Sequence, residues 1–312
     1  MDLPVFLFTG FLESGKTTFI QEALEGDDFN MGERTLLIVC EEGMVEYQPD
    51  KFFGKNVFIE IIDDQSQLTE EYLNSLVTKH MPERVIIEYN GMWQLEALFN
   101  AIPNTWVLYQ EMCFFDSRTF LSYNQNMRQL VFEKLKTAEM VVFNRFENDF
   151  DKMEFHQIVR VANRKSTILY EYEKDNVELD TIEDPLPFNL EKEHIDIEPD
   201  WYAPWYRDIN EEQDKYEGKE LTLTARIVLG GGLAEDELIF GRHIMTCCVD
   251  DIEFAGLVGK SQVPINVEHG GWAELGGIIK NEFHPMYGEE GPVLHITKLE
   301  EVEPLEPEVA TF

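Results

Sequence analysis

The chain has few basic residues, few cysteines and no long apolar run. It carries 25 lysines and arginines against 61 aspartates and glutamates, which gives a formal net charge of -36 at pH 7. Such a field repels nucleic acid and anionic membrane surfaces, so we expect neither as a partner. The acid excess is spread along the whole chain, and we interpret it as a means of staying soluble.

The other absences concern the compartment and the redox state. No apolar stretch reaches the length of a membrane span, and the N-terminus MDLPVFLFTG lacks the basic start and cleavage site of a signal peptide. We therefore expect a cytoplasmic protein that is not inserted in a membrane. The cysteines are too few and too scattered for a disulfide framework, and we expect reduced thiols at Cys40, Cys113, Cys247 and Cys248.

The first part of the chain alternates short apolar runs with segments of helical period, up to about residue 171. The runs are LPVFLFT, TLLIVC, NVFIEII, RVIIEY, TWVLYQEM, EMVVFN and STILYEY. Most are continuous, as in strands covered on both faces, and the alternation predicts an α/β fold with a doubly wound, mostly parallel sheet. Helices are expected over residues 17–24, 68–79, 95–101 and 120–136.

The second part of the chain differs in composition and in hydrophobic period. Residues 172–216 are acidic and contain prolines, which predicts a connector, and the aromatic cluster WYAPWY indicates that its middle is anchored by packing. From about residue 217 the hydrophobic period becomes two, and five strand candidates predict a small all-β, OB-like barrel. A chain of 312 residues suits this division into 1–171, 172–216 and 217–312.

A phosphate-binding loop follows the first apolar run. The stretch GFLESGKTT, residues 10–18, fits the pattern G-x-x-x-x-G-K-[ST] between a predicted strand and a predicted helix. In such a loop the backbone NH groups bind phosphate oxygens, the lysine reaches the outer phosphates and the Ser or Thr hydroxyl binds Mg²⁺. We expect nucleotide contacts from Gly10, Glu13, Ser14, Gly15, Lys16, Thr17 and Thr18.

Two later strands end in residues that would complete a nucleotide site. Glu88, three residues before Gly91, is the acid expected to serve Mg²⁺ together with Thr17. Asn144 and Glu147, with Arg145 between them, hold the positions of a guanine-reading N-K-x-D pattern. A carboxylate there accepts hydrogen bonds from the ring NH and the amino group of guanine, which adenine cannot donate in that arrangement.

Together these motifs resemble the CobW-type GTPases, relatives of the nickel-insertion GTPases, over residues 2–171. The E-x-x-G motif is matched by Glu88 and Gly91, and the switch segment VCEEGMVEY, residues 39–47, matches N-E-x-G except for Cys40. The resemblance implies a slow GTPase that uses Mg²⁺ and works in metal homeostasis or metallocofactor assembly. It also implies GTP and GDP as ligands, a metalloprotein as a candidate partner, and pairing of two subunits as an option.

The chain departs from the family pattern at three places. The guanine motif has Arg145 and Glu147 where Lys and Asp are usual. We expect this altered motif to bind GTP in preference to ATP. The metal motif C-x-C-C is missing, since residues 60–80 contain no cysteine. The loop has Glu13 where Gly is usual, and we expect its carboxylate to lean outward, toward the switch segment or a second subunit.

The C-terminal part resembles the C-terminal domain of bacterial permease-associated proteins, through IFGRHIMTCCVDD and WAELGGIIK. This resemblance implies a binding module and makes a permease a second candidate partner. His243, Cys247 and Cys248 could hold zinc only if a bulge brought them together, because adjacent strand residues face opposite sides. The alternative, which we favour, is a pair of reduced core thiols.

Three functions are compatible with these residues. The first is a Mg²⁺-dependent nucleoside triphosphatase in which Glu41 or Glu46 positions the attacking water, although either could equally be a solvated acid. The second is a nucleotide-gated adaptor that regulates a transporter with little hydrolysis, which the missing metal motif favours. The third is an ATP-dependent small-molecule kinase, for which the sequence offers no acceptor site.

Overall fold

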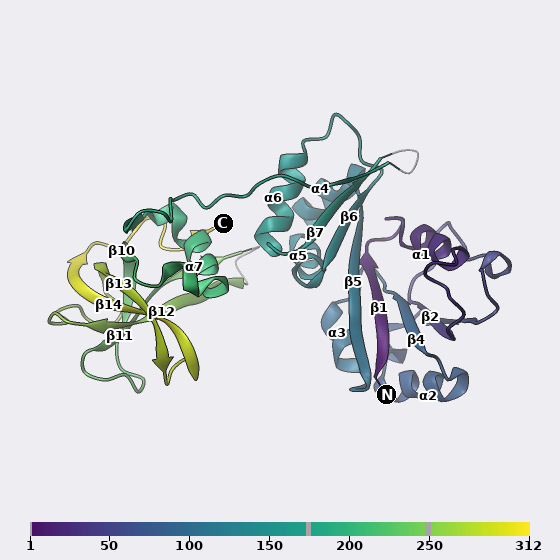
Figure 1. The fold of residues 1–312 in the computed structure, drawn as a ribbon, viewed down its shortest axis with the longest axis horizontal. Helices are drawn as coiled ribbons and strands as arrows, with labels where there is room; N and C mark the ends of the chain where they lie inside the picture. The colour runs from purple at the N-terminus through teal and green to yellow at the C-terminus, as the bar shows by residue number, and fades with distance from the viewer. Residues whose placement is uncertain (1, 173–175, 247–250) are drawn as a thin grey trace. The chain divides into compact units, whose positions relative to one another are not determined.

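The computed structural model describes residues 2–172, 176–246 and 251–312. The chain divides into two compact units, Met1–Glu183 and Asp184–Phe312, each with a sheet of its own (Figure 1). Within the described ranges, no helix combines the length and the apolar character that a membrane span needs.

The first unit contains one sheet with the strand order β3-β2-β4-β1-β5-β6-β7-β8. Every neighbouring pair is parallel except β7 with β8, which confirms the predicted mostly parallel sheet. The strands are β1 (Leu3–Gly10), β2 (Thr35–Val39), β3 (Val57–Ile61), β4 (Arg84–Glu88), β5 (Trp106–Asp116), β6 (Met140–Asn144), β7 (Thr167–Glu171) and β8 (Val177–Leu179).

Helices of this unit follow the predicted segments with two differences. The helix expected over 120–136 is two helices, because Met127 leaves the helical conformation with φ -135°. A further helix, α6, was not expected. The helices are α1 (Lys16–Glu25), α2 (Glu70–His80), α3 (Leu95–Ala101), α4 (Ser117–Asn126), α5 (Arg128–Thr137) and α6 (Lys152–Ala162), with short 3-10 turns η1 (Pro49–Lys51) and η2 (Gln65–Gln67).

Helices cover both faces of the sheet because successive strand residues point to opposite sides. Val5 and Leu7 of β1 share a core with α2 and α3, whereas Phe8 packs with Ile20 and Leu24 of α1. Burial on both faces explains why most of the strand sequences are continuous apolar runs. In a parallel sheet the carboxyl ends of the strands lie at one edge, and this edge carries the loops after β1, β2, β4 and β6.

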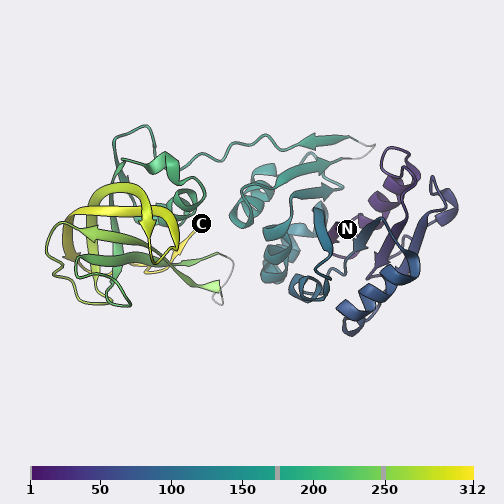
Figure 2. The ribbon, with the colours of Figure 1, turned by 60° about the horizontal axis from the view of Figure 1, so that its bottom comes forward.

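The second unit is built around a closed five-stranded barrel, as predicted (Figure 2). The ring runs β10-β11-β12-β14-β13 and is closed by pairing of β10 with both β13 and β11. Its strands are β10 (Glu220–Val228), β11 (Glu237–Met245), β12 (Glu253–Ser261), β13 (Trp272–His284) and β14 (Glu289–Val302), extended at the edges by β9 (His194–Ile197) and β15 (Ala310–Thr311).

The connector expected over residues 172–216 is divided between the two units. β8 extends the first sheet, while β9, η3 (Pro199–Trp201), α7 (Tyr202–Glu211) and η4 (Gln213–Tyr216) pack on the barrel. Tyr202 and Trp205 of the aromatic cluster are fully buried, and the Tyr202 hydroxyl donates to the Ala255 carbonyl at 2.8 Å. The boundary between the two compact units lies at 183/184, inside the segment expected to be a connector.

One carboxyl group lies inside the first sheet. Glu111, in the middle of β5, is fully buried and accepts a hydrogen bond from the Thr137 hydroxyl at 2.9 Å, and its Oε2 has no partner among the described residues. Burial raises the pKa of Glu111 to about 7. Since the folded pKa is the higher one, this group destabilises the fold as pH rises from about 4.5 to about 7.

We therefore predict that Glu111→Gln stabilises the protein more at about pH 8 than at about pH 5, by roughly 2 kcal/mol of unfolding free energy. The amide keeps the acceptor for Thr137 and removes the buried ionisation. Denaturant unfolding at both pH values measures the difference, with the exposed Glu22→Gln as control. Equal stabilisation at the two pH values would contradict the account.

Candidate nucleotide site

The loop between β1 and α1 has the backbone geometry of a phosphate cradle. Gly10, Glu13 and Gly15 have positive φ angles of 124°, 62° and 105°. A Cβ atom at Gly10 would lie 2.0 Å from the Phe114 carbonyl oxygen, and one at Gly15 would lie 2.1 Å from Asn144 Nδ2. Gly10 is thus required by the close approach of the Phe114 backbone and by its positive φ angle, whereas at Gly15 the positive φ angle is what favours glycine.

The loop presents polar groups that suit an anion. α1 begins at Lys16 after an N-cap glycine without a side-chain cap, and in the described chain the NH groups of Lys16, Thr17 and Thr18 have no protein acceptor. Ser14 Oγ is buried and, among the described residues, also has no partner. A helix N-terminus with open NH groups is favourable for phosphate, so the residues present fit a nucleotide triphosphate tail.

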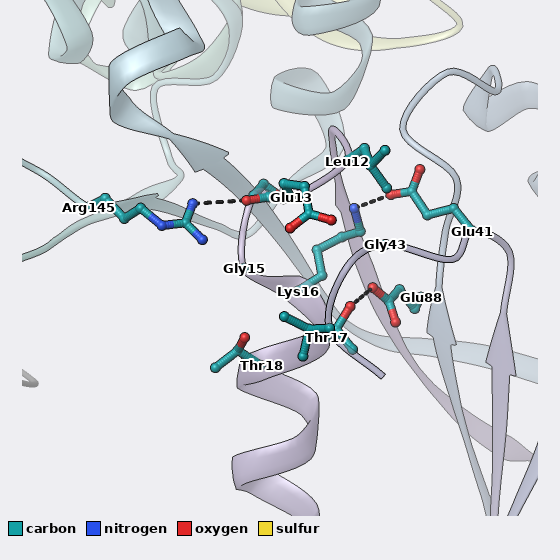
Figure 3. Close-up of a pocket in the computed structure, with 12 residues that line it drawn as sticks. Leu12, Glu13, Gly15, Lys16, Thr17, Thr18, Glu41, Gly43, Glu88 and Arg145 are labelled. Carbon is teal, nitrogen blue, oxygen red and sulfur yellow. Dashed lines mark hydrogen bonds and ion pairs between the residues drawn. The ribbon is translucent and has the colours of Figure 1, made fainter. Parts of the chain in front are cut away.

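Figure 3 shows the pocket that this loop forms with the switch segment and the end of β4. The lining residues are Leu12, Glu13, Ser14, Gly15, Lys16, Thr17, Thr18, Glu41, Gly43, Val45, Glu88 and Arg145.

Lys16 is the buried cation at the centre of the pocket. Its side chain is only 2% exposed, and Nζ donates to the carbonyl oxygens of Gly10 at 2.8 Å and Phe11 at 3.0 Å. The third partner of Nζ is the carboxylate of Glu41, which follows β2. Burial of this charge is compensated by these three acceptors, and a phosphate oxygen would have to replace one of them at the ammonium group.

Thr17 and Glu88, the two residues expected to serve Mg²⁺, are joined by a hydrogen bond. The Thr17 hydroxyl donates to Glu88 Oε1 at 2.6 Å, and the Tyr47 hydroxyl donates to Glu88 Oε2 at 2.5 Å. Burial raises the pKa of Glu88 above its ordinary value, while the two hydroxyl hydrogen bonds partly lower it. A hydroxyl and a carboxylate are the oxygen ligands that Mg²⁺ prefers, so this pair fits the ion. Tyr47 was not among the predicted site residues.

Gly91 brings a backbone NH group to the same pocket. Its nitrogen donates to Glu41 Oε2 at 3.1 Å, so the Glu41 carboxylate bridges Lys16 and Gly91. A Cβ atom at Gly91 would lie 2.6 Å from Phe11 Cα, which is too close for any side chain. The glycine of the E-x-x-G motif is therefore fixed by its contact with the phosphate loop.

The Glu13 carboxylate is directed toward the switch segment, one of the two positions expected. Its Oε1 accepts a hydrogen bond from the Met44 backbone NH at 2.6 Å, and Met44 follows Gly43 in the chain. The Glu13 carbonyl accepts from Arg145 at 2.9 Å, and Arg145 also pairs with Asp116 at 2.7 Å. The acid at position 13 thus connects the loop to the switch segment.

The structure brings part of the guanine motif to the phosphate loop. Asn144 Nδ2 donates to the Ser14 carbonyl at 3.2 Å, whereas the side chain of Glu147 is exposed and does not line the pocket. Glu46 is also exposed and lines a neighbouring cavity of about 280 Å³. Asp116 was not among the predicted site residues, although its position at the end of β5, next to β1 and β6, was a usable signal.

No group of three or more His, Cys, Asp or Glu side chains suited to a metal ion occurs in the described ranges. His243, in β11, is half-buried with its ring against Phe254, and its two candidate co-ligands Cys247 and Cys248 lie outside the described residues. Cys40 is a buried free thiol whose pKa is raised by burial to about 12, so thiolate formation there is strongly disfavoured.

Comparison with known proteins gives a family match for one part of the chain and structural similarities for more of it. No curated protein matches the chain. Similar solved structures include the Zn(II)-bound YjiA GTPase from E. coli, at 14% identity and TM-score 0.44, covering 83% of this chain and 93% of that one. Another is the hydrogenase maturation factor HypB from Archaeoglobus fulgidus, at 13% identity and TM-score 0.41, covering 55% of this chain and 82% of that one. Residues 172–309 match the DUF1980 C-terminal domain family.

Proposed function

We propose that the chain is a Mg²⁺-dependent nucleoside triphosphatase, a slow GTPase of the CobW type. The observation that carries the proposal is the convergence on one pocket of the buried Lys16, the open NH groups of the first turn of α1, and the Thr17 and Glu88 pair. These groups lie together at the carboxyl edge of a parallel sheet, which is where such sheets bind ligands, and a glycine turn without a ligand does not require that arrangement.

Each residue has a separate part in the proposed reaction. Lys16 and the backbone NH groups bind the phosphates and stabilise the negative charge that develops on them. Thr17 and Glu88 hold Mg²⁺, which supplies neutralisation of charge on the terminal phosphates. Tyr47 orients Glu88 through its hydroxyl hydrogen bond and is a positioning residue.

The proposed base is guanine. Asn144 donates a hydrogen bond to the Ser14 carbonyl of the phosphate loop. The chain segment that follows Asn144 and contains Glu147 therefore begins beside the proposed nucleotide site. Glu147 then provides the carboxylate that accepts from the ring NH and the amino group of guanine. The resemblance to CobW-type GTPases supports the same choice over ATP.

We further propose that the activity serves metal homeostasis or metallocofactor assembly, with a metalloprotein or a permease as partner. The resemblance of the motifs supports this role, and the missing C-x-C-C sequence means that any metal would be handled without that motif. The barrel of the second unit is the proposed partner-binding module.

Lys16→Ala tests the proposed hydrolysis. We expect phosphate release from GTP to fall by at least about 100-fold, because the variant removes the buried ammonium group that would bind the phosphates. Release from GTP and ATP would be measured with Mg²⁺ for wild type and variant. Lys136→Ala, at an exposed lysine of the same unit, is the control and should match wild type.

Two outcomes would change the proposal. Tight GTP binding by the wild type without phosphate release would make the protein a nucleotide-gated adaptor. Equal release by wild type and Lys16→Ala would mean that the activity does not come from this site.

Glu147→Gln tests the choice of base. We expect the affinity for GTP to fall by about tenfold and that for ATP to stay the same, because the amide can accept but no longer satisfies both guanine donors. The control is Asp149→Asn, which removes an equal charge from an exposed position of the same loop. An unchanged ratio of GTP to ATP affinity would show that Glu147 does not read the base.

A further inference from the structure

Glu41 has the contacts that a terminal phosphate would need. One carboxylate oxygen pairs with Lys16 Nζ, and the other accepts from the Gly91 backbone NH at 3.1 Å. A lysine ammonium and a backbone NH group are the donor set that binds phosphate oxygens in phosphate loops. The Glu41 side chain is only 9% exposed in this position.

We infer that Glu41 is a specificity-determining residue that competes with the terminal phosphate and thereby sets the preference between nucleoside triphosphate and diphosphate. The inference rests on the proposed nucleotide site and adds to it a residue that distinguishes two ligand states. This role differs from the one expected for Glu41 from the sequence, which is the positioning of the attacking water.

Charge makes the competition unavoidable. The pocket already contains a second buried carboxylate, Glu88, and Lys16 is the cation that Glu41 contacts. A terminal phosphate that binds Lys16 and Gly91 would bring its negative charge into contact with the Glu41 carboxylate. Two negative charges in contact repel strongly in a buried site. Glu41 must therefore leave when a triphosphate binds, whereas a diphosphate has no group for that position.

The displacement of Glu41 is coupled to the switch segment. Other hydrogen bonds also hold this segment at the nucleotide site, among them those from the Met44 NH to Glu13 at 2.6 Å, from the Tyr47 hydroxyl to Glu88 at 2.5 Å and from the Cys40 NH to the Glu88 carbonyl at 2.8 Å. Gly43 allows the first of these, since a Cβ atom there would lie 2.5 Å from Glu13 Oε1. Loss of the two Glu41 contacts weakens the attachment of this segment, which also carries the exposed apolar side chain of Met44.

The test compares the affinities of the full chain for GDP and for a non-hydrolysable GTP analogue, each with Mg²⁺, by isothermal titration calorimetry. The variant is Glu41→Gln, which keeps the shape and removes the charge. We expect the analogue to bind about tenfold more tightly to Glu41→Gln than to wild type, with the GDP affinity changed by less than about twofold. Glu42→Gln, an equal charge change at the exposed neighbouring residue, should keep the wild-type ratio.

Structural damage cannot produce this result, because it would weaken both nucleotides together. Glu41→Ala, which removes both contacts, should shift the ratio in the same direction and covers the case in which Glu41→Gln folds poorly. An unchanged ratio in a folded variant, or a weaker binding of the analogue relative to GDP, would overturn the inference and leave the nucleotide site intact. Failure of the wild type to bind either nucleotide would instead overturn the proposed function and the inference with it.

Discussion

The buried ammonium group of Lys16 is the interaction on which the nucleotide site depends. A charge that is 2% exposed needs partners, and the loop carbonyls of Gly10 and Phe11 together with Glu41 provide them. The backbone of the phosphate loop wraps around this side chain, the switch segment is attached to it through Glu41, and Gly91 is attached through the same carboxylate. Three strand ends are thereby connected to one cation.

The acid excess of the chain has a local counterpart at this site. Glu13, Glu41 and Glu88 all line the pocket, against Lys16 and Arg145. Arg145 is already bonded to Asp116 and to the Glu13 carbonyl. Binding of a triphosphate therefore requires either added positive charge or removal of a carboxylate, and the proposed Mg²⁺ site and the proposed displacement of Glu41 are two forms of the same requirement.

The sequence was sufficient for the parallel sheet, the barrel and the position of the phosphate loop. Continuous apolar runs and glycine spacing are local signals, and the strands that they predict are present, together with the pairing of Thr17 and Glu88. The contacts of Glu41 with Gly91 and of Tyr47 with Glu88 could not be predicted, because they join residues about 50 and about 41 positions apart through tertiary packing. The aromatic cluster around Trp205 was recognised as anchored, but its acidic surroundings concealed that it belongs to the barrel core.

The most direct test of the central claim is a crystal structure of the chain grown with Mg²⁺ and a non-hydrolysable GTP analogue. The account predicts the phosphates in the loop of residues 10–17, Mg²⁺ bound by Thr17 and Glu88, and a terminal phosphate on Lys16 and Gly91 with Glu41 displaced. A nucleotide bound elsewhere, or a loop that keeps the contact between Lys16 and Glu41 with the analogue present, would contradict it.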